Sequence, residues 1–195
     1  SPWVAAEAGA RCVDLALMPP AVREFWQQHC TAQGRVLAER SARQAAMSAL
    51  GKRLEAVEVA PGLTVRQFIA TTNDPNAAAS EFLRGATVRA VRYKAGALAV
   101  EAEVEIRPRT FIGSLRAWGR IHAAGREALD KIEAMLLQAD DTPIRQAGRA
   151  GAPREEILQP TPELLQATAE ASQPIAVLEP PVIHTRPAAT ATATA

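Results

Sequence analysis

The stretch Ala97-Leu-Ala-Val-Glu-Ala-Glu-Val-Glu-Ile-Arg107 alternates apolar and charged side chains, and this alternation decides the fold class. In an extended chain the apolar side chains at even-numbered positions fall on one face, and Glu101, Glu103 and Glu105 fall on the other. A period of two residues predicts a strand with one buried and one solvent-facing side.

A partner strand is expected at 86–93, because Lys94-Ala95-Gly96 supplies a turn between the two segments. The pair would form an antiparallel hairpin, with arginine and glutamate side chains available for cross-strand pairing. We expect the three glutamates to pair with Arg89 or Lys94 on the solvated face, rather than to act as acid–base catalysts or calcium ligands.

Helices are expected on the N-terminal side of the hairpin. Pro19-Pro20 precedes a predicted short helix at 21–33, and Gly34 would end it. A second helix is predicted at 35–54, where several alanines give a thin face suited to close packing. Thr64 is expected to cap a short helix after a small strand.

The longest predicted helix follows the hairpin, at 110–139. Its apolar positions recur at alternating steps of four and three residues, as in a coiled-coil seam. Such a rod would be roughly 45 Å long, so it would either fold back on the earlier helices or meet another chain with its far half. The predicted assembly seam consists of Phe111, Leu115, Trp118, Leu129, Ile132 and Leu136.

Proline, alanine and threonine dominate the C-terminal part of the chain. Eight of the 53 residues from Pro143 to Ala195 are prolines. Sequence of this kind has little to bury, so we expect a disordered or strap-like tail. Two short apolar stretches, 163–165 and 175–178, would be either a linker with a frayed helical turn or docking segments for a neighbouring subunit.

Composition permits one modest core. Alanine accounts for 42 of the 195 residues, and Leu, Ile, Val and Phe together for another 42. We therefore predict an α+β fold, in which a small antiparallel sheet packs against the 35–54 and 110–139 helices. The predicted organisation is an N-terminal segment with a short anchoring helix at 1–34, a core domain at 35–142 and a Pro-rich tail at 143–195.

Charge and hydropathy bear on two classes of protein. The net charge of +1 gives no whole-chain argument for a polyanionic partner. No apolar run approaches the roughly 18–20 residues needed to span a bilayer.

The two cysteines, Cys12 and Cys30, are too few for a disulfide-rich scaffold or a paired-cysteine zinc cluster. The sequence is compatible with a single disulfide between them and with two free thiols. The start Ser1-Pro2-Trp3 fits either a mature form after removal of a signal peptide or an arbitrary boundary.

The sequence contains no motif that predicts catalysis. His29 and Cys30 are neighbours, but adjacent helical side chains point about 100° apart and do not form a nucleophile–base pair. His122 falls on the heptad seam, where a hydrogen-bonded histidine is the simplest interpretation and a pH-sensitive interface the alternative. Without a Gly-rich phosphate loop or a serine elbow, we expect no enzyme, no catalytic residues, no cofactor and no metal, although a site built from distant segments stays open.

A basic stretch at 84–126 carries nine basic and three acidic residues. Arg109, Arg116 and Arg120 would line one helical face, which raises the alternative of a nucleic-acid or anionic-surface binding module. The nearby aromatic residues Phe111 and Trp118 belong to the apolar seam, so no stacking platform for single strands is evident. We therefore expect a solvated basic face, or one that meets acidic neighbours or lipid headgroups, and no nucleic-acid partner.

The order of segments from Ala38 to Ile106 resembles a known family. It comprises an Ala/Arg-rich helix (38–46), the segment Leu-Glu-Ala-Val-Glu-Val (54–59), Leu-Thr-Val-Arg-Gln-Phe (63–68), Leu-Arg-Gly-Ala-Thr-Val (83–88) and the strand Val-Glu-Ala-Glu-Val-Glu-Ile (100–106). This order is similar to that of the LPP-twenty outer-membrane lipoproteins, a family related to flagellar basal-disk and H-ring accessory proteins. The shared motifs are structural, and the resemblance implies no catalytic residues.

The resemblance implies a non-catalytic structural subunit of a bacterial cell-envelope complex, such as a ring or disk associated with the flagellar motor. The expected location is the periplasm or the periphery of the outer membrane. The expected partners are further copies of the chain or other envelope subunits, contacted through the predicted seam.

Overall fold

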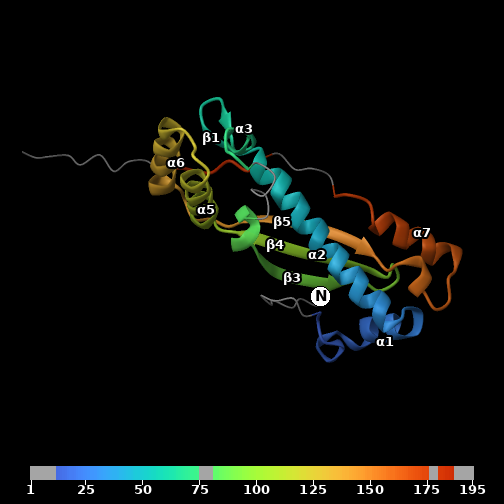
Figure 1. Cartoon of the computed structure of the whole chain (residues 1–195). Coiled ribbons are helices and arrows are strands. Elements are labelled where there is room, and N and C mark those ends of the chain that lie inside the picture. Colours follow the sequence, from blue (N-terminus) through green and yellow to red (C-terminus); the bar gives the residue numbers. More distant parts are fainter. Residues whose placement is uncertain (1–11, 75–80, 176–179, 187–195) are drawn as a thin grey trace, which may run out of the picture. The chain divides into compact units, whose positions relative to one another are not determined.

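The computed structural model describes residues 12–74, 81–175 and 180–186, and its fold is α+β (Figure 1). The helices are α1 (Pro20–His29), α2 (Ala32–Glu55), α3 (Val65–Ala70), α5 (Pro108–Ile121), α6 (Arg126–Gln138) and α7 (Pro162–Ala171). The strands are β1 (Glu58–Ala60), β2 (Leu63–Thr64), β3 (Thr87–Tyr93), β4 (Ala99–Ile106) and β5 (Ile144–Gly151). Within the described ranges, no helix has both the length and the apolar character needed to cross a membrane.

The described residues form two compact units. The first unit draws on residues within 1–50, 86–105 and 145–178, and the second on residues within 51–85, 106–144 and 179–195. This division differs from the predicted linear order of segment, core and tail, because β5 and α7 belong to the first unit.

Helices α1 and α2 follow the predicted pattern with one correction. α1 begins at Pro20, whose fixed φ and missing N–H suit the first position of a helix. It ends at His29 rather than at residue 33, and α2 begins at Ala32. Gly34 therefore lies inside α2 and allows a close approach, because a Cβ there would lie 2.5 Å from the Cβ of Glu156.

The predicted hairpin is confirmed. β3 and β4 pair in antiparallel fashion, with Arg92 opposite Glu101. From Val100 to Ile106 the side chains of β4 alternate between buried and half-buried, as the period of two predicts. Gly96 adopts a left-handed φ of 84° in the connection, a conformation that glycine takes without steric cost.

The prediction of a disordered or strap-like tail from Pro143 onward is wrong for residues 144–151. Residues Ile144–Gly151 form β5, and the order in the three-stranded sheet is β3-β4-β5. Figure 1 shows α2 lying across this sheet. Gly148 makes the contact possible, because a Cβ there would lie 2.1 Å from the Ala46 backbone nitrogen and 2.7 Å from the Ala42 backbone oxygen.

Helix α2 packs through a row of apolar side chains, three of which are alanines. Ala38, Ala42, Ala46 and Leu50 recur every four residues, and all four are 0% exposed. This spacing places them in one stripe along the helix. The predicted thin alanine face is therefore confirmed at Ala42 and Ala46.

A buried carboxylate connects three segments of the first unit. Glu39 in α2 is 0% exposed. Its oxygens accept hydrogen bonds from the backbone N–H of Val13 at 3.1 and 3.3 Å, from the Tyr93 hydroxyl and from the Arg43 guanidinium. Burial, together with the charge of Glu39, raises the pKa of Tyr93 far above its ordinary value, so this phenol stays protonated and donates.

The predicted helix at 110–139 is two helices within the second unit. α5 ends at Ile121 and α6 begins at Arg126, and the two pack against each other as an αα-hairpin (Figure 1). The chain reverses at Ala123, which has a left-handed φ of 55°. The predicted continuous rod is therefore wrong.

The predicted cap at Thr64 is confirmed. Its hydroxyl accepts from the backbone N–H of Gln67 at 3.3 Å, and the Gln67 side-chain oxygen accepts from the backbone N–H of Thr64 at 2.8 Å. This reciprocal pair is a capping box, and it begins α3 directly after β2.

The rest of the predicted tail is partly structured. Thr161 caps α7, which contains the first apolar stretch, and the bridge Ala139–Thr185 holds part of the segment 180–186 in an extended conformation. Most of the second apolar stretch, 175–178, and the residues 187–195 lie outside the described residues.

Candidate functional site

The outer face of the three-stranded sheet carries its charged residues. Because α2 lies across the opposite face, Glu101, Glu103 and Glu105 on β4 point away from the core and are half-buried. The sequence predicted this solvated carboxylate row, and the structure confirms the expected pairing with Arg89. Lys94, the other predicted partner, is exposed in the connection after β3.

Two arginines on β3 bind this row from one side. Arg89 donates to Glu103, and its Nε lies 3.8 Å from Glu105 Oε2. Arg92 lies 3.0 Å from Glu101 Oε1 through Nη1 and 3.6 Å from Glu103 Oε2 through Nη2. Each glutamate of β4 therefore has a guanidinium partner on β3.

Two arginines on β5 bind the row from the other side. Arg145 Nε lies 3.1 Å from Glu105 Oε2, and Arg149 Nε lies 3.1 Å from Glu101 Oε2. These pairs fit the antiparallel arrangement of β4 and β5. We define the charged sheet face as the seven residues Arg89, Arg92, Glu101, Glu103, Glu105, Arg145 and Arg149.

The centre of the charged sheet face is electrostatically ordered. Burial opposes ionisation of Glu103, but the hydrogen bond and charge of Arg89, aided by Arg92 and Arg145, outweigh it. The pKa of Glu103 consequently lies below its ordinary value. The carboxylate is therefore ionised at neutral pH and holds the flanking guanidinium groups in place.

The depressed pKa of Glu103 predicts an acid-dependent loss of stability. A carboxyl whose pKa is lower in the folded state stabilises the fold above its unfolded-state pKa, and this contribution disappears as pH falls through the folded-state pKa. We expect the urea midpoint of the Glu103→Gln variant to fall less steeply than that of the wild type below the ordinary value of 4.5. If the urea midpoints of the wild type and Glu103→Gln fall equally with pH, the lowered pKa of Glu103 is contradicted. Glu155→Gln, a substitution of an exposed residue, serves as the control.

The predicted assembly seam lies inside the αα-hairpin. Phe111, Leu115 and Ile132 are 0% exposed and Trp118 is 6% exposed, while Leu129 and Leu136 are half-buried. Four of the six side chains are therefore buried within their own unit, whereas a contact between chains through Leu129 and Leu136 stays a prediction.

Each arginine of the predicted basic face has at least one acceptor within the chain, which is Glu133 for two of them and a backbone oxygen for the third. Glu133 on α6 accepts from both Arg116 and Arg120 at 3.2 Å. Arg109 donates through Nε to the Ala139 carbonyl oxygen at 3.3 Å. Because Glu133 offsets part of this charge, the geometry gives the nucleic-acid alternative no support.

The histidines and cysteines do not converge. His29 bonds the Phe25 carbonyl oxygen through Nδ1 at 2.9 Å, and His122 stacks on Trp118 with ring centroids 3.8 Å apart. Cys12 and Cys30 are both free thiols. In the part of the chain that the structure describes, no group of three or more His, Cys, Asp or Glu side chains could hold a metal ion.

Cys30 is expected to be chemically inert. Burial, with a contribution from Glu156, raises its pKa to about 11, so only about one thiol in a thousand is ionised at pH 8. In a timed iodoacetamide reaction followed by mass spectrometry, we expect the half-exposed Cys12 to be alkylated much faster than Cys30. Equal alkylation rates for the two cysteines, or thiols that fail to react with iodoacetamide in the unfolded chain, would contradict the structure.

Arg145 and Arg149 are the site residues that the sequence analysis missed. Both fall in the region predicted as tail. The signal was present, since Arg145, Ala147 and Arg149 alternate with Ile144, Gln146, Gly148 and Ala150, a period of two residues.

Comparisons with protein-family models, with curated proteins and with solved structures gave no match to this chain.

Proposed function

We propose that the chain is a non-catalytic assembly subunit of a bacterial cell-envelope complex, of the kind that forms rings or disks around the flagellar motor. Copies of the chain would contact one another through the charged sheet face. The proposed location is the periplasm or the periphery of the outer membrane. The observation that supports the proposal most is the ordered Arg–Glu–Arg arrangement across β3, β4 and β5.

The Arg–Glu–Arg arrangement is suited to binding a partner because ion pairs within the chain already orient its charged side chains. The glutamates are 14–27% exposed, whereas Arg145 and Arg149 remain about half exposed. A partner therefore binds guanidinium groups that are already ordered in the folded chain, so little side-chain entropy is lost on binding. Solvent-exposed ion pairs contribute only about 0–1 kcal/mol each to folding stability. Because this contribution is small, we propose that the main role of so extended a network is recognition of a partner.

The charge pattern is also complementary to itself. The two outer strands carry arginines and the central strand carries glutamates. Neighbouring strands are about 4.8 Å apart, so a second copy displaced by one strand would place its arginine row over the glutamate row of the first. Alternating rows of this kind favour a specific alignment.

The resemblance of residues 38–106 to the LPP-twenty family adds support. The helix, the capped turn at Thr64 and the hairpin follow one another in the order that the family implies. Members of that family are envelope-associated proteins that assemble into larger structures.

Light scattering tests this proposal. We expect the mass of the intact chain to be a multiple of 20.8 kDa at low salt. The mass should fall when added salt shortens the Debye length from roughly 14 Å to about 4 Å, because the exposed charges are then screened from one another. Arg149→Glu should weaken association by about tenfold or more because it places a carboxylate against Glu101. A monomeric mass at low salt would overturn the proposal.

A matched control is available in the second unit. Arg66 is exposed and pairs with Glu55 at 3.0 Å, so Arg66→Glu makes the same charge change at a residue that does not belong to the charged sheet face. Its oligomeric mass should equal that of the wild type. If both variants dissociate, net charge rather than the charged sheet face controls association.

A further inference from the structure

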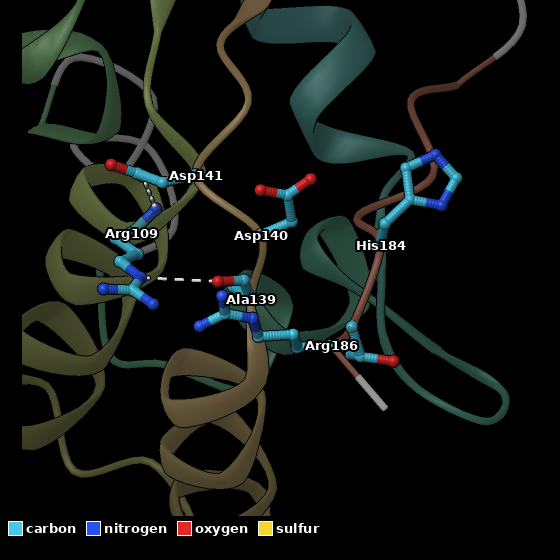
Figure 2. Close-up of a pocket in the computed structure, with 7 residues that line it drawn as sticks. Arg109, Ala139, Asp140, Asp141, His184 and Arg186 are labelled. Carbon is cyan, nitrogen blue, oxygen red and sulfur yellow. Dashed lines mark hydrogen bonds between the residues drawn. The ribbon is translucent and has the colours of Figure 1, made fainter. Parts of the chain in front are cut away.

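A depression in the second unit gathers charged residues from three segments of the chain (Figure 2). Its volume is about 530 Å³. It is lined by Arg109 from the start of α5, by Ala139, Asp140 and Asp141 after α6, and by His184, Thr185 and Arg186.

The last of these segments is held by backbone hydrogen bonds. The backbone N–H of Arg186 donates to the Gln138 oxygen, and that of Asp140 donates to the His184 oxygen, both at 2.8 Å. These bonds hold the backbone of Arg186 against the end of α6. The side chain of Arg186 thereby lines the same depression as Arg109.

The two carboxylates of the depression already have donors. Asp141 accepts from Arg107 Nη1 at 3.1 Å and from the backbone N–H of Arg109 at 3.3 Å. Asp140 accepts from the Thr142 hydroxyl at 2.9 Å. Neither carboxylate is bonded to the guanidinium group of Arg109 or Arg186 among the described residues.

The two arginines keep donors for a ligand. Arg109 uses its Nε for the Ala139 oxygen at 3.3 Å, while its two Nη groups and the whole Arg186 guanidinium have no acceptor within the ranges that the structure describes. In Figure 2 both guanidinium groups lie beside the Ala139 carbonyl, and the Asp140 carboxylate points away from them. Two guanidinium groups with open N–H donors therefore share one depression.

The start of α5 borders the depression through Arg109, whose backbone N–H is already bonded to the Asp141 carboxylate. Arg109 is the second residue of this 14-residue helix. The N-terminal end of a helix carries a partial positive charge that favours anions, and in α5 that anion is Asp141, so the two guanidinium groups remain for a ligand.

We propose that this depression binds a small phosphorylated compound, whose phosphate bridges Arg109 and Arg186. A terminal phosphate offers three oxygens and accepts paired N–H donors from two guanidinium groups, whereas one guanidinium fork is enough for a carboxylate. The rest of the ligand would lie beside His184 and Thr185. This site is separate from the charged sheet face and does not depend on the assembly proposal.

Titration of the ¹⁵N-labelled full chain with glycerol phosphate, followed by NMR, tests the site. We expect saturable shifts of the Arg109, Thr185 and Arg186 amides with a millimolar dissociation constant. Acetate at the same ionic strength should bind at least about tenfold more weakly. No saturable shift at these amides, or equal binding of acetate, would overturn the proposal.

Substitutions identify the groups that bind. Arg109→Gln and Arg186→Gln should each weaken glycerol phosphate binding by about tenfold or more. Both residues are exposed, so we expect little effect on folding. Arg126→Gln is the control, because Arg126 is exposed in the same unit and begins α6, whereas the depression lies at the other end of that helix. Unchanged binding in the two test variants would overturn the proposal, as would an equal loss in the control.

Discussion

Replacing Gly148 by valine is expected to lower the free energy of unfolding by about 3 kcal/mol or more, or to prevent the first unit from folding. The new side chain would overlap the backbone of α2, since even a Cβ at this position would lie 2.1 Å from the Ala46 nitrogen. Backbone atoms of a packed helix cannot rotate away as a flexible side chain can. Urea denaturation followed by far-UV circular dichroism measures the loss.

A glycine in α5 provides the contrast for this experiment. A Cβ at Gly113 would have no atom within 4 Å. Gly113→Ala is therefore expected to raise the free energy of unfolding by about 0.5–1 kcal/mol through helix propensity alone. If Gly148→Val unfolds at the wild-type urea concentration, residues 144–151 do not pack against α2.

Removing the buried carboxylate is expected to have the other large effect. Glu39→Ala should cost about 3–5 kcal/mol, because it leaves the Arg43 guanidinium without its buried ionic partner. It also removes the acceptor of the Tyr93 hydroxyl and the Val13 N–H. The loss is measured by urea denaturation at neutral pH.

Two further substitutions separate charge from packing. Glu39→Gln keeps the shape and one acceptor oxygen, so its cost should fall between that of the wild type and that of Glu39→Ala. Glu55→Gln, on the same helix, removes only the surface pair with Arg66 and should change the free energy by no more than about 0.5 kcal/mol. Equal effects of Glu39→Ala and Glu55→Gln would contradict a buried role for Glu39.

The hairpin and the helix caps could be predicted because their signals are local. Alternation along 97–107, the glycine at position 96 and the capping threonine at position 64 each act within a few residues. The pairing of Arg89 with the β4 glutamates followed from the same alternation.

The αα-hairpin could not be predicted because its heptad pattern runs through the turn. An apolar seam at steps of three and four residues buries equally well against a second chain or against its own other half. The reversal depends on Ala123 in a left-handed conformation, which alanine rarely adopts. No proline near this position marks the break.

The third strand was missed because its composition argues against a strand. β5 consists largely of alanine, glycine and arginine, which lack the β-branched or aromatic side chains typical of strands. Gly148 reflects the nearness of α2, a tertiary contact that local sequence does not encode. Missing β5 also concealed Arg145 and Arg149, and with them half of the arginines on the charged sheet face.

Amide hydrogen exchange across β5 in the intact chain tests the central claim most directly, because the charged sheet face exists only if residues 144–151 complete the sheet. An outer antiparallel strand directs alternate N–H groups toward its neighbour. We predict that alternate amides of Ile144–Gly151 are protected to a degree comparable with those of β4. Exchange of all these amides at the rate of an unstructured peptide would contradict the third strand, and with it the site proposed for assembly.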